Sequence, residues 1–71
     1  MKNGKIVIKL DSLLKEKGMS KTKFAQRAEL QMTQLNRYIN NDIALISIDV
    51  LERMCSVLEC DVSDILSFEE V

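Results

Sequence analysis

Apolar residues recur three and four positions apart in several short stretches of this chain, the spacing that places them on one face of an α-helix. The spacing predicts five short helices, over residues 11–17, 21–28, 31–40, 48 to about 60, and 62–66. The apolar residues expected on the inward faces of the first four are Leu10, Leu13, Leu14, Phe24, Ala25, Ala28, Leu35, Tyr38, Ile39, Leu51, Met54, Cys55 and Leu58. The pattern therefore predicts an all-α fold.

Residues that favour helix ends mark the predicted boundaries. Four side chains are expected to cap helix N-termini, because their oxygens accept hydrogen bonds from the first backbone N–H groups. These are Asp11, Ser20, Ser47 and Asp61. Gly18 is expected to end the first helix in the left-handed conformation, and residues 40–42 form a predicted turn after the third helix.

Three segments outside the helices have a different pattern. Residues 5–10 are rich in β-branched side chains and predict a strand or extended arm, and residues 67–71 alternate in character. These two segments could form a short β-ribbon, either within one chain or between two chains. The apolar loop Ile43–Ile46 either packs beneath the fourth helix or forms an exposed surface for a partner.

Length and hydrophobicity limit what kind of protein this is. Seventy-one residues, 46% of them hydrophobic, are enough for one domain over residues 1–71, because two separate cores would each be too small. The longest uninterrupted apolar run, Ile43–Ile46, is far shorter than the ~20 residues that span a bilayer. The N-terminal residues also lack the apolar stretch of a secretory signal. We therefore expect a cytoplasmic protein without a membrane anchor.

The residue types present give little support to catalysis. The chain has no histidine, the commonest general base and metal ligand, and only two cysteines. Cys55 and Cys60 are expected on different faces of one helix and its end, as small buried apolar side chains without a disulfide. We therefore expect no enzyme activity, no metal, no cofactor and no small-molecule substrate.

The charges are unevenly divided along the chain. The net charge is −1, but residues 1–40 carry nine basic and three acidic side chains, a net +6, whereas residues 41–71 carry one basic and eight acidic, a net −7. If the fold keeps the two halves on different faces, one face attracts phosphates and the other repels them. Alternatively, the opposite charges simply pair across the surface.

The second and third predicted helices, over about residues 20–40, fit a helix-turn-helix, in which the second helix enters the major groove of DNA. Opposite the apolar face of this second helix lie four polar side chains, none of them acidic. They are Thr33, Asn36, Arg37 and Asn40. Arg37 can read guanine, Asn36 adenine, and Thr33 a base edge or a thymine methyl, while Gln31 and Met32 start the helix. The alternative is an ordinary solvated helix face.

Two segments carry a resemblance to a known family. Residues 20–41 read SKTKFAQRAELQMTQLNRYINN, with the small Ala25 where two helices cross, the apolar pair Leu35 and Tyr38, and Asn40 closing the second helix. Residues 47–66 read SIDVLERMCSVLECDVSDIL. Together they resemble the helix-turn-helix and the following two helices of Cro/C1-type (Xre family) phage and bacterial repressors, and the resemblance covers about residues 6–69.

The resemblance implies a λ-repressor-like DNA-binding domain of five short helices. It also implies sequence-specific binding to double-stranded DNA as a homodimer, with the helix over residues 31–40 in the major groove, in order to regulate transcription as a repressor. The residues implied to face bases are Gln31, Met32, Thr33, Asn36 and Arg37. Those implied to hold phosphates are Lys21, Lys23, Asn40 and Asn41.

The chain departs from the family pattern at several positions. Glu29 and Asn41 replace frequent glycines, so that a non-glycine residue is strained or the turn is reshaped at Glu29. Asp42 and Ala44 stand where many relatives carry basic residues, which predicts a modest affinity for DNA. Met32 replaces a common polar base reader. The alternative function is a protein-interaction module on the same fold, such as an antitoxin-like or adaptor domain with weak DNA affinity.

Overall fold

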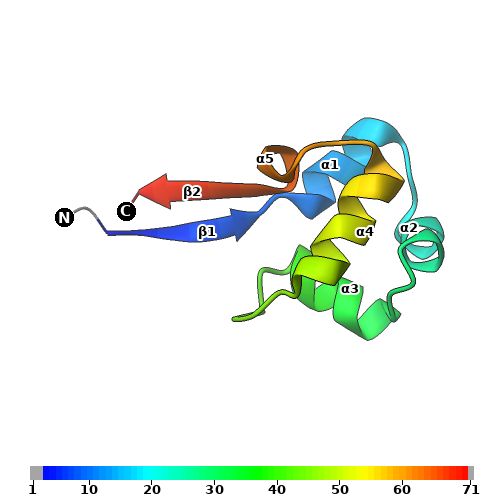
Figure 1. Cartoon of the computed structure of the whole chain (residues 1–71), viewed down its shortest axis with the longest axis horizontal. Coiled ribbons are helices and arrows are strands. Elements are labelled where there is room, and N and C mark those ends of the chain that lie inside the picture. Colours follow the sequence, from blue (N-terminus) through cyan, green and yellow to red (C-terminus); the bar gives the residue numbers. More distant parts are fainter. Residues whose placement is uncertain (1–2, 71) are drawn as a thin grey trace.

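Five helices form one body, and a two-stranded ribbon projects from it (Figure 1). The structure, a computed structural model, describes residues 3–70. The elements in this range are β1 (Gly4–Ile8), α1 (Leu10–Lys17), α2 (Lys21–Arg27), α3 (Met32–Ile39), α4 (Ile48–Leu58), α5 (Val62–Ile65) and β2 (Leu66–Glu70). The molecule measures 40 × 22 × 19 Å because the ribbon stands clear of the helices. The fold confirms the expected five-helix architecture with a ribbon.

Most of the predicted N-caps are present. The Ser20 hydroxyl accepts a hydrogen bond from the backbone N–H of Lys23 at 3.2 Å, and the Ser47 hydroxyl accepts one from Val50 at 3.1 Å. Asp61 begins α5 through a capping box in which its own N–H donates to the Asp64 carboxylate at 3.0 Å. These caps satisfy backbone donors that a helix start leaves without intrahelical partners.

The first helix begins earlier than predicted. Lys9, not Asp11, occupies the N-cap position, and no side chain caps this end. Asp11 lies in the first turn, where a carboxylate still suits the positive end of the helix. The burial of Leu10 explains the shift, because starting the helix at Leu10 places this side chain in the core. α2 and α3 are one or two residues shorter than predicted, and α4 and α5 end at Leu58 and Ile65.

Within residues 3–70, four turns place a residue in the left-handed region, and one of these four residues is glycine. Gly18 has φ +66°, whereas Glu29, Asn41 and Glu59 have φ values of 56°, 58° and 51°. After Glu29 the backbone N–H of Leu30 returns to the Ala25 carbonyl at 2.9 Å, the hydrogen bond of a Schellman helix end. Glu29 thus adopts the conformation that glycine favours, and the turn keeps its usual shape.

The ribbon pairs the two ends of one chain. β1 and β2 are antiparallel, with Ile6 opposite Phe68 and Ile8 opposite Leu66. Gly4 is required at the outer end, because a Cβ atom there would lie 2.3 Å from the Phe68 ring and 2.6 Å from the Glu69 carbonyl. The predicted ribbon is therefore confirmed and forms within the chain. Lys2 and Val71, which entered the charge division and the predicted tail, lie outside the described residues.

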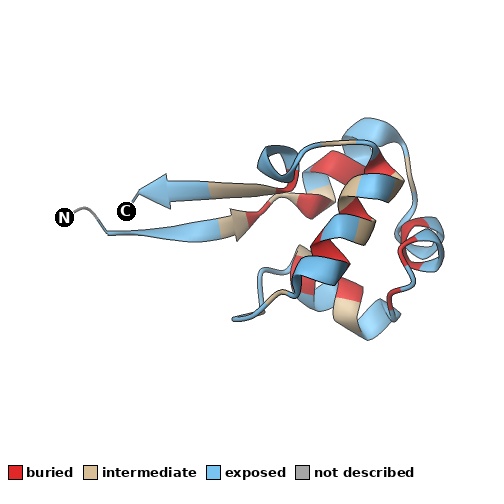
Figure 2. Ribbon diagram, in the orientation of Figure 1, coloured by how far each residue is buried: buried red, intermediate tan, exposed pale blue. Residues whose placement is uncertain are grey.

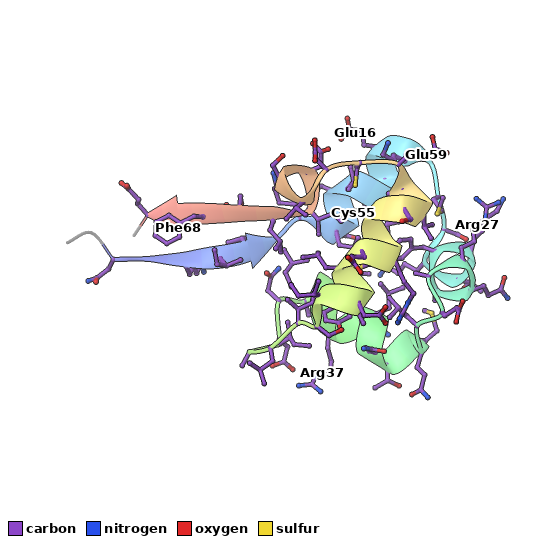
Figure 3. All side chains as sticks on the ribbon, in the orientation of Figure 1. Glu16, Arg27, Arg37, Cys55, Glu59 and Phe68 are labelled. Carbon is purple, nitrogen blue, oxygen red and sulfur yellow. The ribbon has the colours of Figure 1, made fainter. Side chains whose placement is uncertain are left out.

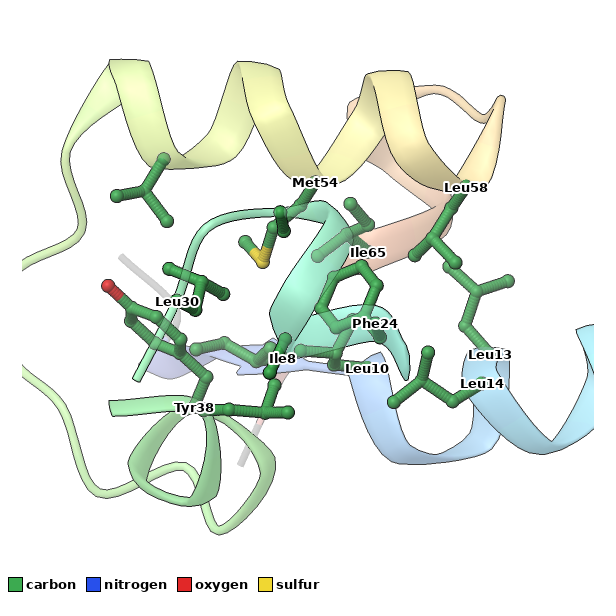
Figure 4. Close-up of a cluster of buried hydrophobic side chains, with 14 of the residues drawn as sticks. Ile8, Leu10, Leu13, Leu14, Phe24, Leu30, Tyr38, Met54, Leu58 and Ile65 are labelled. Carbon is green, nitrogen blue, oxygen red and sulfur yellow. The ribbon is translucent and has the colours of Figure 1, made fainter. Parts of the chain in front are cut away.

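One hydrophobic core joins all five helices and the base of the ribbon (Figures 2 and 4). Its largest fully buried side chains are Phe24, Leu10, Leu35, Met54, Leu58 and Ile65. Ile43 and Ile46 are partly buried against this core, as predicted for packing beneath α4, whereas Leu45 between them is 85% exposed. The loop therefore packs against the core through Ile43 and Ile46 and exposes Leu45 to solvent.

The two cysteines differ from the prediction. Both are free, as expected, but both are only half-buried. The expectation of different faces was wrong, because the left-handed Glu59 folds the chain back and the Cys60 N–H donates to the Cys55 carbonyl at 3.1 Å. Burial raises the pKa of the Cys60 thiol above its ordinary value, and the neighbouring Cys55 thiol and Asp64 carboxylate raise it further.

Candidate nucleic-acid interface

Helix α3 has one buried face and one exposed face. Leu35 and Tyr38 are 0% and 2% exposed and hold the helix to the core. On the opposite face Thr33, Asn36 and Arg37 are exposed. This arrangement follows from the spacing of the two apolar residues and agrees with the face predicted from the sequence.

The ends of α3 extend this exposed surface. Gln31 occupies the N-cap position and is exposed, and Met32 at the first helical position is 40% exposed. At the other end Asn40 is also exposed and follows the last helical residue. No acidic residue lies in the first turn of α2 or α3. Apart from the apolar Met32, the outer surface of α3 thus offers hydrogen-bonding groups, and it has no carboxylate of its own.

A shallow groove runs beside this surface. It has a volume of about 480 Å³ and lies between α3 and the loop that follows it. The lining residues are Gln31, Thr33, Gln34, Arg37, Tyr38, Ile43, Leu45 and Ser47. Arg37 is fixed at the edge of the groove, because its Nε donates to the Asp42 carbonyl at 3.3 Å. The guanidinium of Arg37 is therefore held in place while the residue remains exposed.

Two hydrogen bonds near the interface were not predicted from the sequence: one ties α4 to the end of α2, and the other lies within α3. The Nε of Arg53, on α4, donates to the Ala28 carbonyl at the end of α2 at 2.9 Å, and Arg53 also pairs with Asp49. On α3 the Gln34 amide donates to the Tyr38 hydroxyl at 2.9 Å. Arg53 is the sole basic residue after position 40, and this isolated charge is the feature of the sequence that could have indicated its contact.

Asn41 has a structural role that differs from the phosphate contact expected for it. Its Oδ1 accepts a hydrogen bond from the Ile8 N–H at 2.6 Å, and its Nδ2 donates to the Ile8 carbonyl at 3.1 Å. Both polar side-chain atoms are thus used to tie the end of α3 to β1. The physical reason is that Ile8 ends the ribbon beside this turn, where its backbone groups need partners.

The two lysines expected at phosphates lie in the first turn of α2. Lys21 and Lys23 are both exposed, and the backbone of Lys23 is part of the Ser20 cap. Cations at a helix N-terminus are locally unfavourable, because this end of the helix dipole is positive. Their combined positive charge, however, attracts anions such as phosphates.

Four labelled charged side chains lie at different edges of the molecule. In Figure 3 the labelled acids Glu16 and Glu59 lie at one edge and Arg37 lies at the opposite edge, with Arg27 on a third side. Asp49 near the start of α4 is paired with Arg53. These labelled groups do not decide between the two alternatives drawn from the charge division, because Glu16 belongs to the basic half of the chain and the exposed acid Asp42 lies beside Arg37.

The described part of the chain contains neither a cluster of metal-ligating side chains nor a helix that could span a membrane. No three His, Cys, Asp or Glu side chains within residues 3–70 come together as metal ligands could. The helices in this range are also all too short or too polar to cross a membrane.

Comparison with known proteins identifies the family. The profile of the Cro/C1-type HTH DNA-binding domain matches residues 9–70. The chain is 33% identical over 63 residues to the uncharacterized HTH-type transcriptional regulator YozG of Bacillus subtilis (strain 168), covering 89% of this chain and 75% of that protein.

Two solved structures of regulators resemble this fold. The master regulator for biofilm formation SinR, crystallised in complex with DNA, matches with a TM-score of 0.69 and 30% identity over 75% of this chain and 84% of that chain. The transcriptional regulator VanUg matches with a TM-score of 0.76 over 100% of this chain and 93% of that chain, and its 19% identity supports the fold alone. With a family profile that spans its helices and a helix-turn-helix that presents α3, the chain belongs to the Cro/C1-type HTH DNA-binding domain family.

Proposed function

We propose that this protein is a transcription regulator that binds a specific DNA sequence by inserting α3 into the major groove. The observation that carries the proposal is the exposed, acid-free outer face of α3, fixed by the burial of Leu35 and Tyr38 on the opposite face. A helix-turn-helix presents its second helix to base edges in this way. The similarity to SinR, which was crystallised with DNA, supports the same conclusion.

The base-facing residues have distinct roles in the proposal. Arg37 donates two hydrogen bonds to guanine, Asn36 pairs with adenine, and Thr33 contacts a base edge or a thymine methyl. Gln31 and Met32, at the N-terminal end of α3, lie deepest in the groove, where Met32 makes an apolar contact.

The phosphate-facing residues flank this set. Lys21 and Lys23 at the start of α2 neutralise backbone phosphates, and Asn40 after α3 donates to another. Asn41 is not part of this proposal, because its side chain is bonded to Ile8. Phosphate contacts of this kind position the domain on the duplex without reading its sequence.

The regulator acts as a homodimer on a two-fold DNA site. Half-sites are then centred about 34–36 Å apart, one turn of the double helix, or a multiple of that distance. The regulator represses transcription, catalyses no reaction and is located in the cytoplasm. Repression follows if the dimer covers DNA that the polymerase needs.

The test begins with a selection of bound sequences from random double-stranded oligonucleotides, followed by affinity measurements on the selected site. Arg37→Ala should relax the preference at one base position and weaken binding by about 1–3 kcal/mol. Lys21→Ala should weaken binding to all sequences alike and reduce the salt dependence by about one phosphate contact.

The matched control for charge is Lys17→Ala. Lys17 is an exposed lysine at the end of α1, where its charge acts on Cys60, and it is not among the residues proposed to contact DNA. This variant should bind like the parent protein. Identical binding profiles for the Arg37 and Lys21 variants, or equal losses for Lys17→Ala, would contradict the assigned roles. A protein that selects no sequence and shows no DNA binding at low salt would contradict the function.

A further inference from the structure

One continuous apolar surface lies between the ribbon and the loop after α3. Ile6, Ile8, Leu66 and Phe68 share one face of the ribbon, because residues directly opposite one another in an antiparallel pair point to the same side. The same face meets the loop Ile43–Ile46 in a groove of about 310 Å³. Asn41 is the single polar residue among those that line this groove.

We propose that this surface, called the ribbon–loop surface, binds the same surface of a second copy of the chain. The inference rests on the proposed function in that it names the dimer contact of the regulator. It states which residues form the contact, which the family membership does not provide.

The exposed area of the ribbon–loop surface is large for a chain of this size. Leu45 is 85% exposed, and Ile6 and Phe68 are each 59% exposed. These three side chains together expose on the order of 400 Å² of apolar area, as much as a typical largest apolar patch of a monomer. A standard interface takes about 800 Å² from each partner, so these residues would supply about half of it, with the half-buried residues around the groove adding to this area.

The shape of the surface favours a second copy over a different partner. A two-fold contact uses the same patch on both subunits, so the patch must contain both a projection and a recess that receives it. The ribbon–loop surface has both, because Leu45 projects beside a groove lined by its neighbours Ile43 and Ile46. Leu45 of each copy can therefore enter the groove of the other.

The ribbon itself supports an intermolecular role. A two-stranded ribbon is marginally stable in water on its own. This ribbon extends away from the helices (Figure 1), and Ile6 and Phe68 on its apolar face are each 59% exposed. Covering that face with the equivalent face of a second copy removes Ile6 and Phe68 from water on both subunits. The hydrophobic gain is therefore counted twice for each residue that takes part.

The position of the surface also suits a DNA-binding dimer. The loop Ile43–Ile46 separates the ribbon–loop groove from the polar groove beside α3, and Ile43 and Leu45 contribute to both. A two-fold axis through the ribbon–loop surface thus passes close to the C-terminal end of α3 in both copies. The two α3 helices are then related by the symmetry that a two-fold DNA site requires.

Sedimentation equilibrium of the full chain without DNA tests the inference. The parent protein should be dimeric, and Leu45→Glu should weaken self-association at least about tenfold, because the buried charge enters the contact twice. The matched control is Ile48→Glu, which places the same charge at another apolar residue that is 69% exposed on α4. Leu45 is so exposed that its replacement should leave the unfolding midpoint of the monomer unchanged.

A second variant makes the result independent of the loop. Ile6→Ser on β1 should also weaken self-association, since Ile6 lines the same groove from the ribbon. A parent protein that stays monomeric at millimolar concentration, or dimers of both variants as strong as those of the parent, would overturn the inference. Equal dissociation of the Ile48→Glu control would overturn the choice of surface.

Binding to a DNA duplex with a single half-site separates this inference from the proposed function. Ile6→Ser should bind the single half-site as the parent does and lose the extra affinity of the full two-fold site. Dimers that form as described but fail to bind any selected DNA would refute the proposed function and leave the ribbon–loop contact standing. Normal half-site binding by a protein that does not dimerise through these residues would refute the contact alone.

Discussion

Replacing Glu29 or Glu59 by glycine should stabilise this protein. Both residues end a helix in the left-handed conformation, at φ 56° and 51°. For an L-residue this conformation costs about 1–2 kcal/mol relative to the right-handed region, and glycine does not pay this cost. Glycine loses part of the advantage, about 0.4–1 kcal/mol, because the unfolded chain becomes more flexible. The expected net gain is about 0.5–1 kcal/mol for each substitution.

At the two other turns with a left-handed residue, Gly18 and Asn41, substitution should destabilise the protein. Gly18→Ala should destabilise the protein by about 1 kcal/mol, and because no atom lies within 4 Å of a Cβ there, the loss reports the backbone alone. Asn41→Gly relieves the backbone but removes both hydrogen bonds to Ile8. At about 0.5–1.5 kcal/mol for each bond, the loss exceeds the gain, so this variant should be less stable than the parent.

Urea unfolding followed by circular dichroism measures these differences. Each stabilising change should raise the urea concentration at the midpoint of unfolding without altering the slope of the free energy against urea. In a thermal unfolding experiment, 1 kcal/mol corresponds to a rise of about 4–8 °C in Tm for a domain of this size. Glu29→Gln and Glu59→Gln remove the same charge but keep the Cβ atom, and should be neutral. If the glutamine variants stabilise as much as the glycine variants, charge and not backbone strain is responsible. A stabilising Asn41→Gly would show that the bonds to Ile8 contribute little.

Three further predictions concern other contacts. Arg53→Ala should cost about 1.5–3 kcal/mol in urea unfolding, because the Ala28 carbonyl loses a charged donor, whereas Asp49→Ala should cost less than about 1 kcal/mol, since its pair with Arg53 is largely exposed. Tyr38→Phe should cost about 0.5–1.5 kcal/mol by removing the acceptor of the Gln34 amide, and equal stability would refute that bond. Folding raises the pKa of the Cys60 thiol, so the neutral thiol contributes to the stability of the fold below about pH 9, and this contribution is lost as the pH rises through the folded-state pKa. Cys60→Ser lacks this thiol and should therefore lose less stability than the parent protein when the pH is raised into the alkaline range.

The sequence was sufficient for the parts of the fold that local rules determine. The spacing of Leu35 and Tyr38 placed α3 and its outer face, and Ser20 and Ser47 identified two helix starts, because each depends on neighbours within one turn. Asp11 failed as a cap because the helix begins one residue before it, at the fully buried Leu10. The apolar spacing had placed Leu10 on the inward face but did not determine the residue at which the helix begins.

Contacts between distant segments could not be predicted from the sequence. Arg53 meets the Ala28 carbonyl 25 residues away, and Asn41 meets Ile8 across 33 residues. Nothing in a local pattern distinguishes an asparagine that binds backbone groups from one that binds phosphate, because both lie exposed at a helix end. Cys60 shows a similar failure at short range, since helical geometry was extended through Glu59, where the chain reverses.

The turn after α3 joins the two surfaces on which the proposed activity depends. Arg37 on the α3 side is held by the Asp42 carbonyl, and Asn41, one residue earlier, is bonded to both backbone groups of Ile8 at the base of the ribbon. Any change in the angle of the ribbon therefore pulls on the residue next to the one that orients Arg37. In a dimer formed through the ribbon, the distance between the two α3 helices is fixed by these bonds. In that dimer Asn41 serves DNA recognition through its two hydrogen bonds to Ile8, because they set the spacing of the half-sites.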